Sequence, residues 1–280
     1  MKDFYVINSL GEKEPFSLKK VYVSCRNSGL DDYSARMIAW MVKKKVHPGI
    51  TTFEISRMIN EVLRKEFPQS AIKFSLKSAI RRLGPAGFTF EKYVGEIFAR
   101  NGYQVRLNQH LFGLCRCEYE IDFLAKKDDF IYVGECKYHN LPGERIDLRV
   151  ALANHARFLD IAKGPFFKSE KLKSILVTNT KFTSEAMRYS KCVGVAMLGW
   201  KYPKKKGLEY LIEKQNLYPI TILPSFRGYL TEIFAQKRKM LVLDLLENPV
   251  EKLSRKLKVK EKEIAKLVKE AEILLGRYES

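Results

Sequence analysis

Two short stretches place acidic and basic side chains near the ends of predicted strands. The first is "EYEID", which ends at Asp122, and the second is "VGECKYHN", which contains Glu135, Cys136 and Lys137. Successive side chains of a strand point to opposite faces, so Glu135 and Lys137 should share one face and Cys136 should lie on the other. If the two stretches pair as a hairpin, Asp122, Glu135 and Lys137 meet near one end of a sheet.

These residue types suit metal-assisted hydrolysis of a phosphodiester. Asp122 and Glu135 offer the hard oxygen ligands that Mg²⁺ prefers, and Mg²⁺ usually takes only one or two carboxylates. Lys137 could orient a water molecule or stabilise charge that develops on a phosphate. Cys136 is expected to turn its side chain into the core and to offer its backbone carbonyl to the metal. The simpler interpretation is an exposed ion pair between Glu135 and Lys137, with Asp122 capping a turn.

The elements that must position these residues follow from the pattern of residues 86–222. "TFEKYVGEIFARNG" has helical spacing, and "YQVRL", "CEYEIDFLA" and "FIYVGECK" are typical of strands. "DLRVALANHARFLDIAKG" is predicted to be a helix, followed by the strand "SILVTN", the helix "TSEAMRYSKCVG" and the strand "VAMLGW". The order α-β-β-β-α-β-α-β predicts a mixed α/β sheet with helices on both faces.

An aspartate followed by E-x-K on paired strands resembles the PD-(D/E)xK nucleases, and "EIDF…VGECKYHN" is similar to the Mrr-type restriction endonuclease domain within that superfamily. The similarity extends to "GFTFEKYVGEIFARNGYQV" and to the segment that starts at "VTNTKFTSEAM", so it covers residues 86–222. The resemblance implies that Asp122 and Glu135 hold the metal and that Lys137 is the catalytic lysine. It also implies that Glu91, on the opening helix, completes the site.

Several neighbours of this motif have roles that stay open. Glu120 lies one strand step before the aspartate, on the same expected face, and is either a further ligand or a surface residue. His139 and Asn140 follow the lysine and are expected to shape the rim of the site. Many Mrr-type domains carry a glutamine on the helix after the E-x-K strand. This chain reads "ALANHARF" there, so Asn154 or His155 would have to replace it.

Residues 1–85 are predicted to begin with a β-hairpin, "FYVINSLGEKEPF", followed by helices with apolar residues at three- and four-residue steps. The hairpin, "EPFSLKKV", "ITTFEI" and "AIRRLGPAG" together resemble an ATP-cone domain, a module that binds adenine nucleotides. The resemblance implies nucleotide contacts from Glu14, Ser17, Lys20 and Thr52. The family usually carries two basic residues before its turn, where this chain has Asn8 and Ser9. The segment is therefore expected to bind nucleotide weakly, to bind another ligand or to serve in assembly.

Residues 223–280 are expected to be helical throughout and strongly charged, with Pro249 ending a helix formed by "KMLVLDLLE". The segment loosely resembles the helix-hairpin-helix modules of recombination proteins. In that interpretation, helix N-termini and lysines would contact DNA phosphates without sequence preference. The alternative is a helical appendage that supports dimer formation or covers a sheet.

The bulk composition favours a polyanionic partner. The 280 residues carry a formal charge of +19, which favours nucleic acid over a merely solvated lysine-rich surface. No apolar run is long enough to span a bilayer, and the N-terminus lacks the apolar core of a signal peptide. These features predict a cytoplasmic protein with no membrane partner. The odd number of cysteines fits reduced thiols, and Cys115-x-Cys117 lacks a second pair at zinc-site spacing.

The sequence thus predicts a multidomain α+β protein with three segments: an ATP-cone-like domain in 1–85, a nuclease domain in 86–222 and a helical, DNA-binding region in 223–280. The predicted function is an Mg²⁺-dependent DNA endonuclease of restriction type, with Mn²⁺ as a substitute metal and ATP or dATP as an effector. One alternative is a catalytically silent DNA-binding or regulatory protein that senses nucleotide. Another is a repair or junction-resolving nuclease. PD-(D/E)xK nucleases that cut both strands often dimerise, so a homodimer is expected.

Overall fold

The computed structural model describes three ranges of the chain, residues 4–83, 89–167 and 170–278. The contacts among its elements divide it into two compact units. Unit 1 contains Met1–Ile80, Ile220–Leu230 and Leu241–Ser280, and unit 2 contains Arg81–Pro219 and Thr231–Met240. The C-terminal helices therefore group with the N-terminal ones. The division into three consecutive segments stays a prediction, and its first boundary, at residues 85 and 86, lies outside the described ranges.

Unit 1 is mainly helical. Its elements are β1 (Tyr5–Ile7), β2 (Lys13–Pro15), α1 (Leu18–Asn27), α2 (Asp32–Lys45), α3 (Thr52–Glu66), α4 (Pro68–Phe74), α5 (Leu76–Ile80), η1 (Ile220–Ile222), η2 (Val242–Leu245), α11 (Val250–Leu257) and α12 (Glu261–Leu275). β1 and β2 form the expected hairpin. Its turn contains Gly11 at φ 79°, a left-handed conformation that glycine adopts without steric cost. No helix in the described ranges combines the length and apolar character that a bilayer crossing requires.

The C-terminal part of unit 1 packs on its N-terminal part. α12 contacts α4, where the Gln69 side chain donates a hydrogen bond to the carbonyl of Leu274 at 3.0 Å. The predicted helical character of residues 223–280 is confirmed, with one correction. "KMLVLDLLE" contains the short 3-10 helix η2 instead of an α-helix. Asp244 explains this turn, because its buried carboxylate accepts a hydrogen bond from the backbone N–H of Leu241 and closes it locally.

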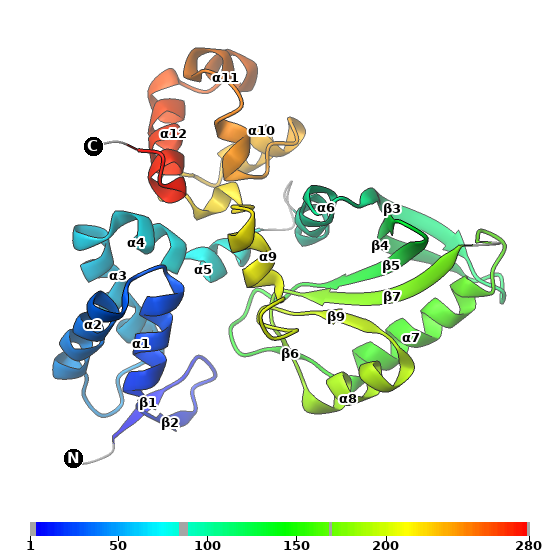
Figure 1. Ribbon diagram of the computed structural model, residues 1–280, viewed down its shortest axis with the longest axis horizontal. Coiled ribbons are helices and arrows are strands. Elements are labelled where there is room, and N and C mark those ends of the chain that lie inside the picture. Colours follow the sequence, from blue (N-terminus) through cyan, green and yellow to red (C-terminus); the bar gives the residue numbers. More distant parts are fainter. Residues whose placement is uncertain (1–3, 84–88, 168–169, 279–280) are drawn as a thin grey trace. The chain divides into compact units, whose positions relative to one another are not determined.

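Unit 2 contains the predicted mixed sheet (Figure 1). Its elements are α6 (Phe90–Arg100), β3 (Gln104–Phe112), β4 (Glu118–Lys127), β5 (Phe130–Lys137), β6 (Arg145–Ile146), α7 (Leu148–Ala162), β7 (Lys171–Thr178), β8 (Lys181–Phe182), α8 (Ser184–Val193), β9 (Ala196–Leu198) and α9 (Leu208–Lys214), and α10 (Leu230–Gln236) crosses the boundary between the units. In the described part of the chain, the central sheet has the order β3-β4-β5-β7-β9. β3, β4 and β5 pair antiparallel, whereas β5, β7 and β9 pair parallel.

Helices cover both faces of this sheet, as predicted (Figure 1). α6 lies on one face, where the rings of Phe98 and Phe123 are in contact. α7 and α8 lie on the other face, where Ile161 of α7 joins an apolar cluster with Ile121 and Val133. On the α6 face of the sheet, the Phe123 ring packs directly against Gly134 of β5. A Cβ atom on Gly134 would stand 2.2 Å from the Phe123 ring, so any larger residue before the acidic site would require this ring or β5 to shift.

Candidate active site

Asp122 lies where β4 and β5 begin to separate. The last regular pair of the two strands joins Phe123 to Gly134. One step further, the Asp122 carboxylate accepts a hydrogen bond from the backbone N–H of Cys136, with 2.6 Å between Oδ2 and N. The side chain takes the place of a bond of the strand ladder. It thereby ties together the two sequence stretches that were predicted to form a hairpin.

The alternation of side chains along β4 breaks at Asp122. Ile121 and Leu124 belong to the apolar cluster on the α7 side of the sheet, whereas Phe123 packs against α6. Two residues three positions apart cannot share a face of a regular strand. The prediction that Glu120 and Asp122 share one face of the sheet assumed strict alternation of side chains. That assumption does not apply across this break. Glu120 is exposed.

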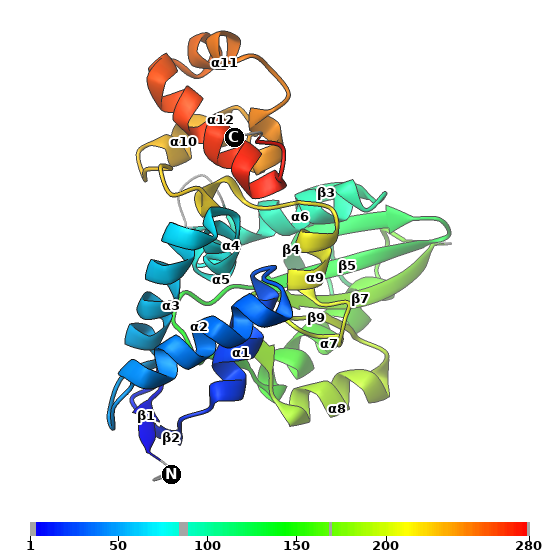
Figure 2. The same ribbon diagram turned by 60° about the vertical axis from the view of Figure 1, so that its left-hand side comes forward.

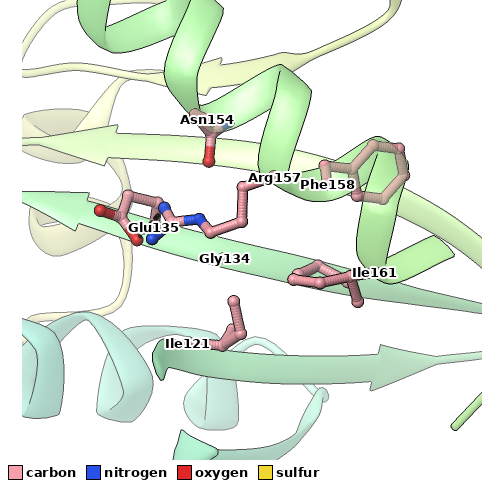
Figure 3. A pocket seen from close by; sticks show the side chains of 8 residues that line it. Ile121, Gly134, Glu135, Asn154, Arg157, Phe158 and Ile161 are labelled. Atoms are coloured by element: carbon pink, nitrogen blue, oxygen red, sulfur yellow. Dashed lines mark ion pairs between the residues drawn. The ribbon is translucent and has the colours of Figure 1, made fainter. Parts of the chain in front are cut away.

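Glu135 is only 6% exposed and is paired with two cations. Lys137 Nζ lies 2.7 Å from Oε1 of Glu135, and a guanidinium nitrogen of Arg157 lies 2.5 Å from Oε2. Figure 3 shows Arg157 reaching from α7 to Glu135 across a narrow, mainly apolar hollow between α7 and the sheet. A carboxylate buried this deeply is stable as an anion only when its charge is compensated, and these two cations supply that compensation.

The electrostatics of Asp122 differ from those of Glu135. Burial is the largest cause that raises the pKa of Asp122, to about 6. The hydrogen bond from the backbone of Cys136 opposes this rise, and the charges of Glu135 and Glu91 add to it. Lys137 lowers the pKa by a smaller amount. Glu91, on the first turn of α6, is therefore near enough to act on Asp122, so the other three predicted catalytic residues all influence the Asp122 carboxyl.

The Cys136 side chain is 5% exposed and turns into the core, as predicted. Burial raises the pKa of this thiol well above its usual range, and the neighbouring carboxylates of Asp122 and Glu91 raise it further. The thiol therefore stays protonated and is a poor nucleophile. Its backbone N–H serves the site by holding Asp122. The role of its carbonyl as a metal ligand stays a prediction.

α7, the helix after β5, contributes Arg157 to the site, a residue that the sequence did not single out. Asn154 lines the hollow beside Glu135, but its side-chain amide donates to Ser174 at 2.9 Å. His155 contacts the Tyr189 hydroxyl instead. The hydrogen bonds of these two side chains go to Ser174 and Tyr189, and Arg157 is the α7 residue that pairs with Glu135. The available signal was the helical step of three residues from Asn154 to Arg157, which puts both on one helix face.

The rim after Lys137 is fixed by Asn179, a second residue that the sequence did not single out. Its side chain accepts a hydrogen bond from the backbone N–H of His139 at 2.9 Å and donates one to the carbonyl of the same residue at 2.7 Å. The His139 ring contacts Glu144, with 2.9 Å between Nδ1 and Oε2. His139 is half-buried and Asn140 is exposed, and their role in shaping the rim of the site stays a prediction.

The oxygen donors of this site fit a hard divalent cation. The Asp122 carboxyl is largely desolvated and is influenced by two further carboxylates, an environment in which a cation lowers the cost of ionisation. Among the described residues, no group of three or more His, Cys, Asp or Glu is arranged to hold a metal ion. One or two carboxylates together with water are enough for Mg²⁺. Asp122 and Glu135 are the residues that would hold it, and there the metal would compete with Arg157 for Glu135.

A second candidate site lies in unit 1. Four residues that were predicted to contact nucleotide line one pocket of about 120 Å³, and these are Glu14, Ser17, Lys20 and Thr52. Lys20 Nζ lies 3.2 Å from the Glu14 carboxylate. The Ser17 hydroxyl caps α1 by accepting from the backbone N–H of Lys20. At the hairpin turn, Asn8 accepts hydrogen bonds from the backbone N–H groups of Leu10 and Glu12, so it stabilises the turn.

Comparisons with known proteins identify relatives for most of the chain. Residues 218–275 match the family model described as "AF1548-like, C-terminal". An uncharacterized protein of Archaeoglobus fulgidus is 35% identical over 183 residues, which are 65% of this chain and 100% of the relative. The crystal structure of the protein of unknown function AF1548 is similar with a TM-score of 0.57 and 34% identity, covering 66% of this chain and 97% of that chain. The chain therefore belongs to the AF1548-like family.

Proposed function

We propose that this protein is a metal-dependent DNA endonuclease of restriction type, with an Mrr-like nuclease domain and DNA as its substrate in the cytoplasm. The observation that supports this proposal best is the junction of β4 and β5. There the Asp122 carboxylate is held on the backbone of Cys136, beside the acidic and basic side chains of Glu135 and Lys137. The formal charge of +19 supplies affinity for a polyanion.

Each residue of the site has a role that its surroundings permit. Lys137 is 45% exposed in its side chain, so its ammonium group can reach a phosphate oxygen and orient an attacking water molecule. Asp122 and Glu135 would hold Mg²⁺ or Mn²⁺, with Glu91 supporting Asp122 from α6. A bound metal would supply Lewis-acid activation of water and stabilisation of the charge on the phosphate. Arg157 holds Glu135 in place and balances its charge.

The test of this function is conversion of supercoiled plasmid to nicked or linear forms in the presence of Mg²⁺ or Mn²⁺. The proposal predicts conversion that stops when the metal is chelated. A repair or junction-resolving nuclease is distinguished by its substrates. Such an enzyme would cleave branched or single-stranded DNA faster than an intact duplex. A restriction-type enzyme would prefer an intact duplex and would cleave methylated and unmethylated duplexes at different rates.

One observation favours a second candidate, a catalytically silent DNA-binding or regulatory protein. Glu135 is already neutralised by two cations, and one of them, Arg157, comes from a neighbouring helix. In a silent protein this ion pair would be a structural replacement for a metal. Salt-dependent DNA retention without cleavage under any divalent metal would support this candidate.

A regulatory role for unit 1 belongs to the same proposal. The ATP-cone-like segment would bind ATP or dATP in the pocket that Glu14, Ser17, Lys20 and Thr52 line. A lysine and two hydroxyls suit a phosphate group through charge and hydrogen bonding. Assembly of two copies would place two nuclease centres on one duplex, so that each centre could cleave one strand.

A further inference from the structure

The last two helices of unit 1 follow a compact pattern of buried positions. Leu253 and Leu257 of α11 and Ile264 and Leu267 of α12 are each at most 3% exposed. Between the helices, Val259 is 6% exposed and packs inward from the connection. These apolar positions fix the two helices to each other, because each helix buries one stripe and leaves the opposite side to solvent.

The connection between α11 and α12 is a sharp three-residue turn. Lys258 adopts φ 54° and ψ 39°, the left-handed conformation that ends a helix abruptly. Ser254 closes the turn from both sides, since its carbonyl accepts from the Val259 N–H and its hydroxyl donates to the Val259 carbonyl. Figures 1 and 2 both show α11 lying across the N-terminal end of α12. Two helices joined by such a turn, with the second crossing the first, form the helix-turn-helix arrangement.

The outer face of α12 is basic. Lys262, Lys266 and Lys269 are exposed and follow each other at steps of four and three residues, with the small residue Ala265 among them. Over residues 250–278 there are nine lysines and arginines against five glutamates. Two of these glutamates are held by partners within unit 1. Glu263 accepts from the Tyr229 hydroxyl, and Glu270 accepts from Ser225.

We propose that α11, its turn and α12 form a helix-turn-helix surface that docks on double-stranded DNA, with the lysine face of α12 entering the major groove. A helix fits the width of the major groove of B-DNA, and a narrow face with Ala265 at its centre can approach the base edges. Lys262 and Lys266 contact the phosphates at the groove edge, and Lys256 and Lys258 extend the basic surface onto α11 and the turn. This surface differs from contact through helix N-termini, the mode expected of helix-hairpin-helix modules.

The test is binding of the full chain to a labelled duplex of about two helical turns (~20 base pairs) and to a single strand of equal length, measured by fluorescence anisotropy in the presence of EDTA. The test variant is Lys262→Ala/Lys266→Ala. The matched control is Lys44→Ala/Lys45→Ala on α2, which removes the same charge from exposed positions of the same unit. We expect the test variant to weaken duplex binding about tenfold or more at ~0.1 M salt and to reduce the salt slope by about two.

The proposal further requires that the control variant stays within about twofold of wild type and that single-strand binding changes less than duplex binding. Equal losses in the two variants would overturn it, since general charge alone would then explain the affinity. Equal losses for duplex and single strand would also overturn it. The outcome is independent of the nuclease proposal, because EDTA prevents metal-dependent cleavage. Failure of cleavage with intact helix-turn-helix binding would refute only the nuclease.

Discussion

Arg157 of α7 and Glu135 of β5 form an ion pair, with 2.5 Å between a guanidinium nitrogen and Oε2. The pair joins α7 to β5, and Lys137 supplies a second cation to the same carboxylate. Glu135 is buried, so these two cations compensate a charge that would otherwise be costly to bury. The loss of either cation should therefore have a measurable effect on stability.

Arg157→Ala should lower the free energy of unfolding by about 1–3 kcal/mol, because the buried Glu135 would lose one of its two compensating cations. Arg157→Lys should restore part of this loss by returning the charge without the planar geometry. Urea unfolding followed by circular dichroism measures both changes.

The matched control for that variant is Arg149→Ala on the same helix, since Arg149 pairs with Asp147 at an exposed position. Its unfolding midpoint should equal that of the wild-type protein. If Arg157→Ala were equally silent, Glu135 would not depend on Arg157 for charge compensation.

Asp122→Asn should stabilise the protein at neutral pH. The pKa of Asp122 is raised from an ordinary value of 3.8 to about 6, so the folded state binds a proton more tightly than the unfolded state. Stability from this group is present below about pH 4 and is lost as the pH rises through the window from 4 to 6. The full shift corresponds to about 3 kcal/mol, which solvent screening of this partly exposed carboxyl reduces to about 1–2 kcal/mol.

Asparagine keeps an oxygen that can accept the hydrogen bond from Cys136, so the variant should retain the strand junction. Urea unfolding at about pH 7.5 and about pH 4.5 should show a stabilisation at the higher pH that shrinks at the lower one. A variant that is less stable than wild type at both pH values would mean that the ionised carboxylate supports the fold rather than burdening it.

Gly134→Ala should destabilise unit 2 by about 1–3 kcal/mol, because the added methyl group meets the Phe123 ring in a closely packed core. The variant should also displace Glu135, which follows directly. Gly228→Ala is the control, since a Cβ atom there has nothing within 4 Å. Thermal unfolding measures the stability of both variants. A similar melting temperature for the two would show that β5 accommodates the added methyl group without loss of stability.

Wild-type protein should bind ATP or dATP only weakly, with Kd above about 100 µM. The hairpin turn presents Asn8 and Ser9 in place of two basic residues, and Lys20 is paired with Glu14 in the pocket. Asn8→Lys/Ser9→Arg should strengthen binding by adding charged donors for phosphate. Isothermal titration calorimetry measures both affinities. Tight binding by wild type, or no gain in the variant, would show that the turn does not contact the phosphates.

Much of the fold follows from the sequence, because the order and the periodicity of the predicted elements specify the central sheet and its covering helices. The hairpin that joins Asp122 to Glu135 follows from two apolar runs separated by a short polar turn. Arg157 could not be predicted in the same way, because its partner is set by how α7 packs on the sheet. Neither could the break in side-chain alternation at Asp122, because it accompanies a hydrogen bond to the neighbouring strand that the residue pattern does not show.

In the N-terminal and C-terminal segments as well, local sequence patterns predict the helices but not the contacts between distant segments. Local patterns predicted the helices of residues 1–85 and 223–280, but the grouping of these distant segments in one unit depends on long-range contacts such as that between Gln69 and Leu274. The η2 segment was expected to be α-helical because its apolar content fits a helix. The buried carboxylate of Asp244, which closes the turn, could not be foreseen from that pattern.

The most direct test of the central claim is cleavage of supercoiled plasmid with Mg²⁺ by wild type, Asp122→Ala, Lys137→Ala and the control Lys126→Ala, which alters an exposed lysine on β4. Wild type and the control should cleave at similar rates. The Asp122 and Lys137 variants should each be slower by about 100-fold or more, because the first loses a carboxylate that would hold the metal and the second loses the cation that reaches the phosphate. Equal cleavage rates for all four proteins, or no cleavage by wild type with any divalent metal, would contradict the assignment of this site as a nuclease centre.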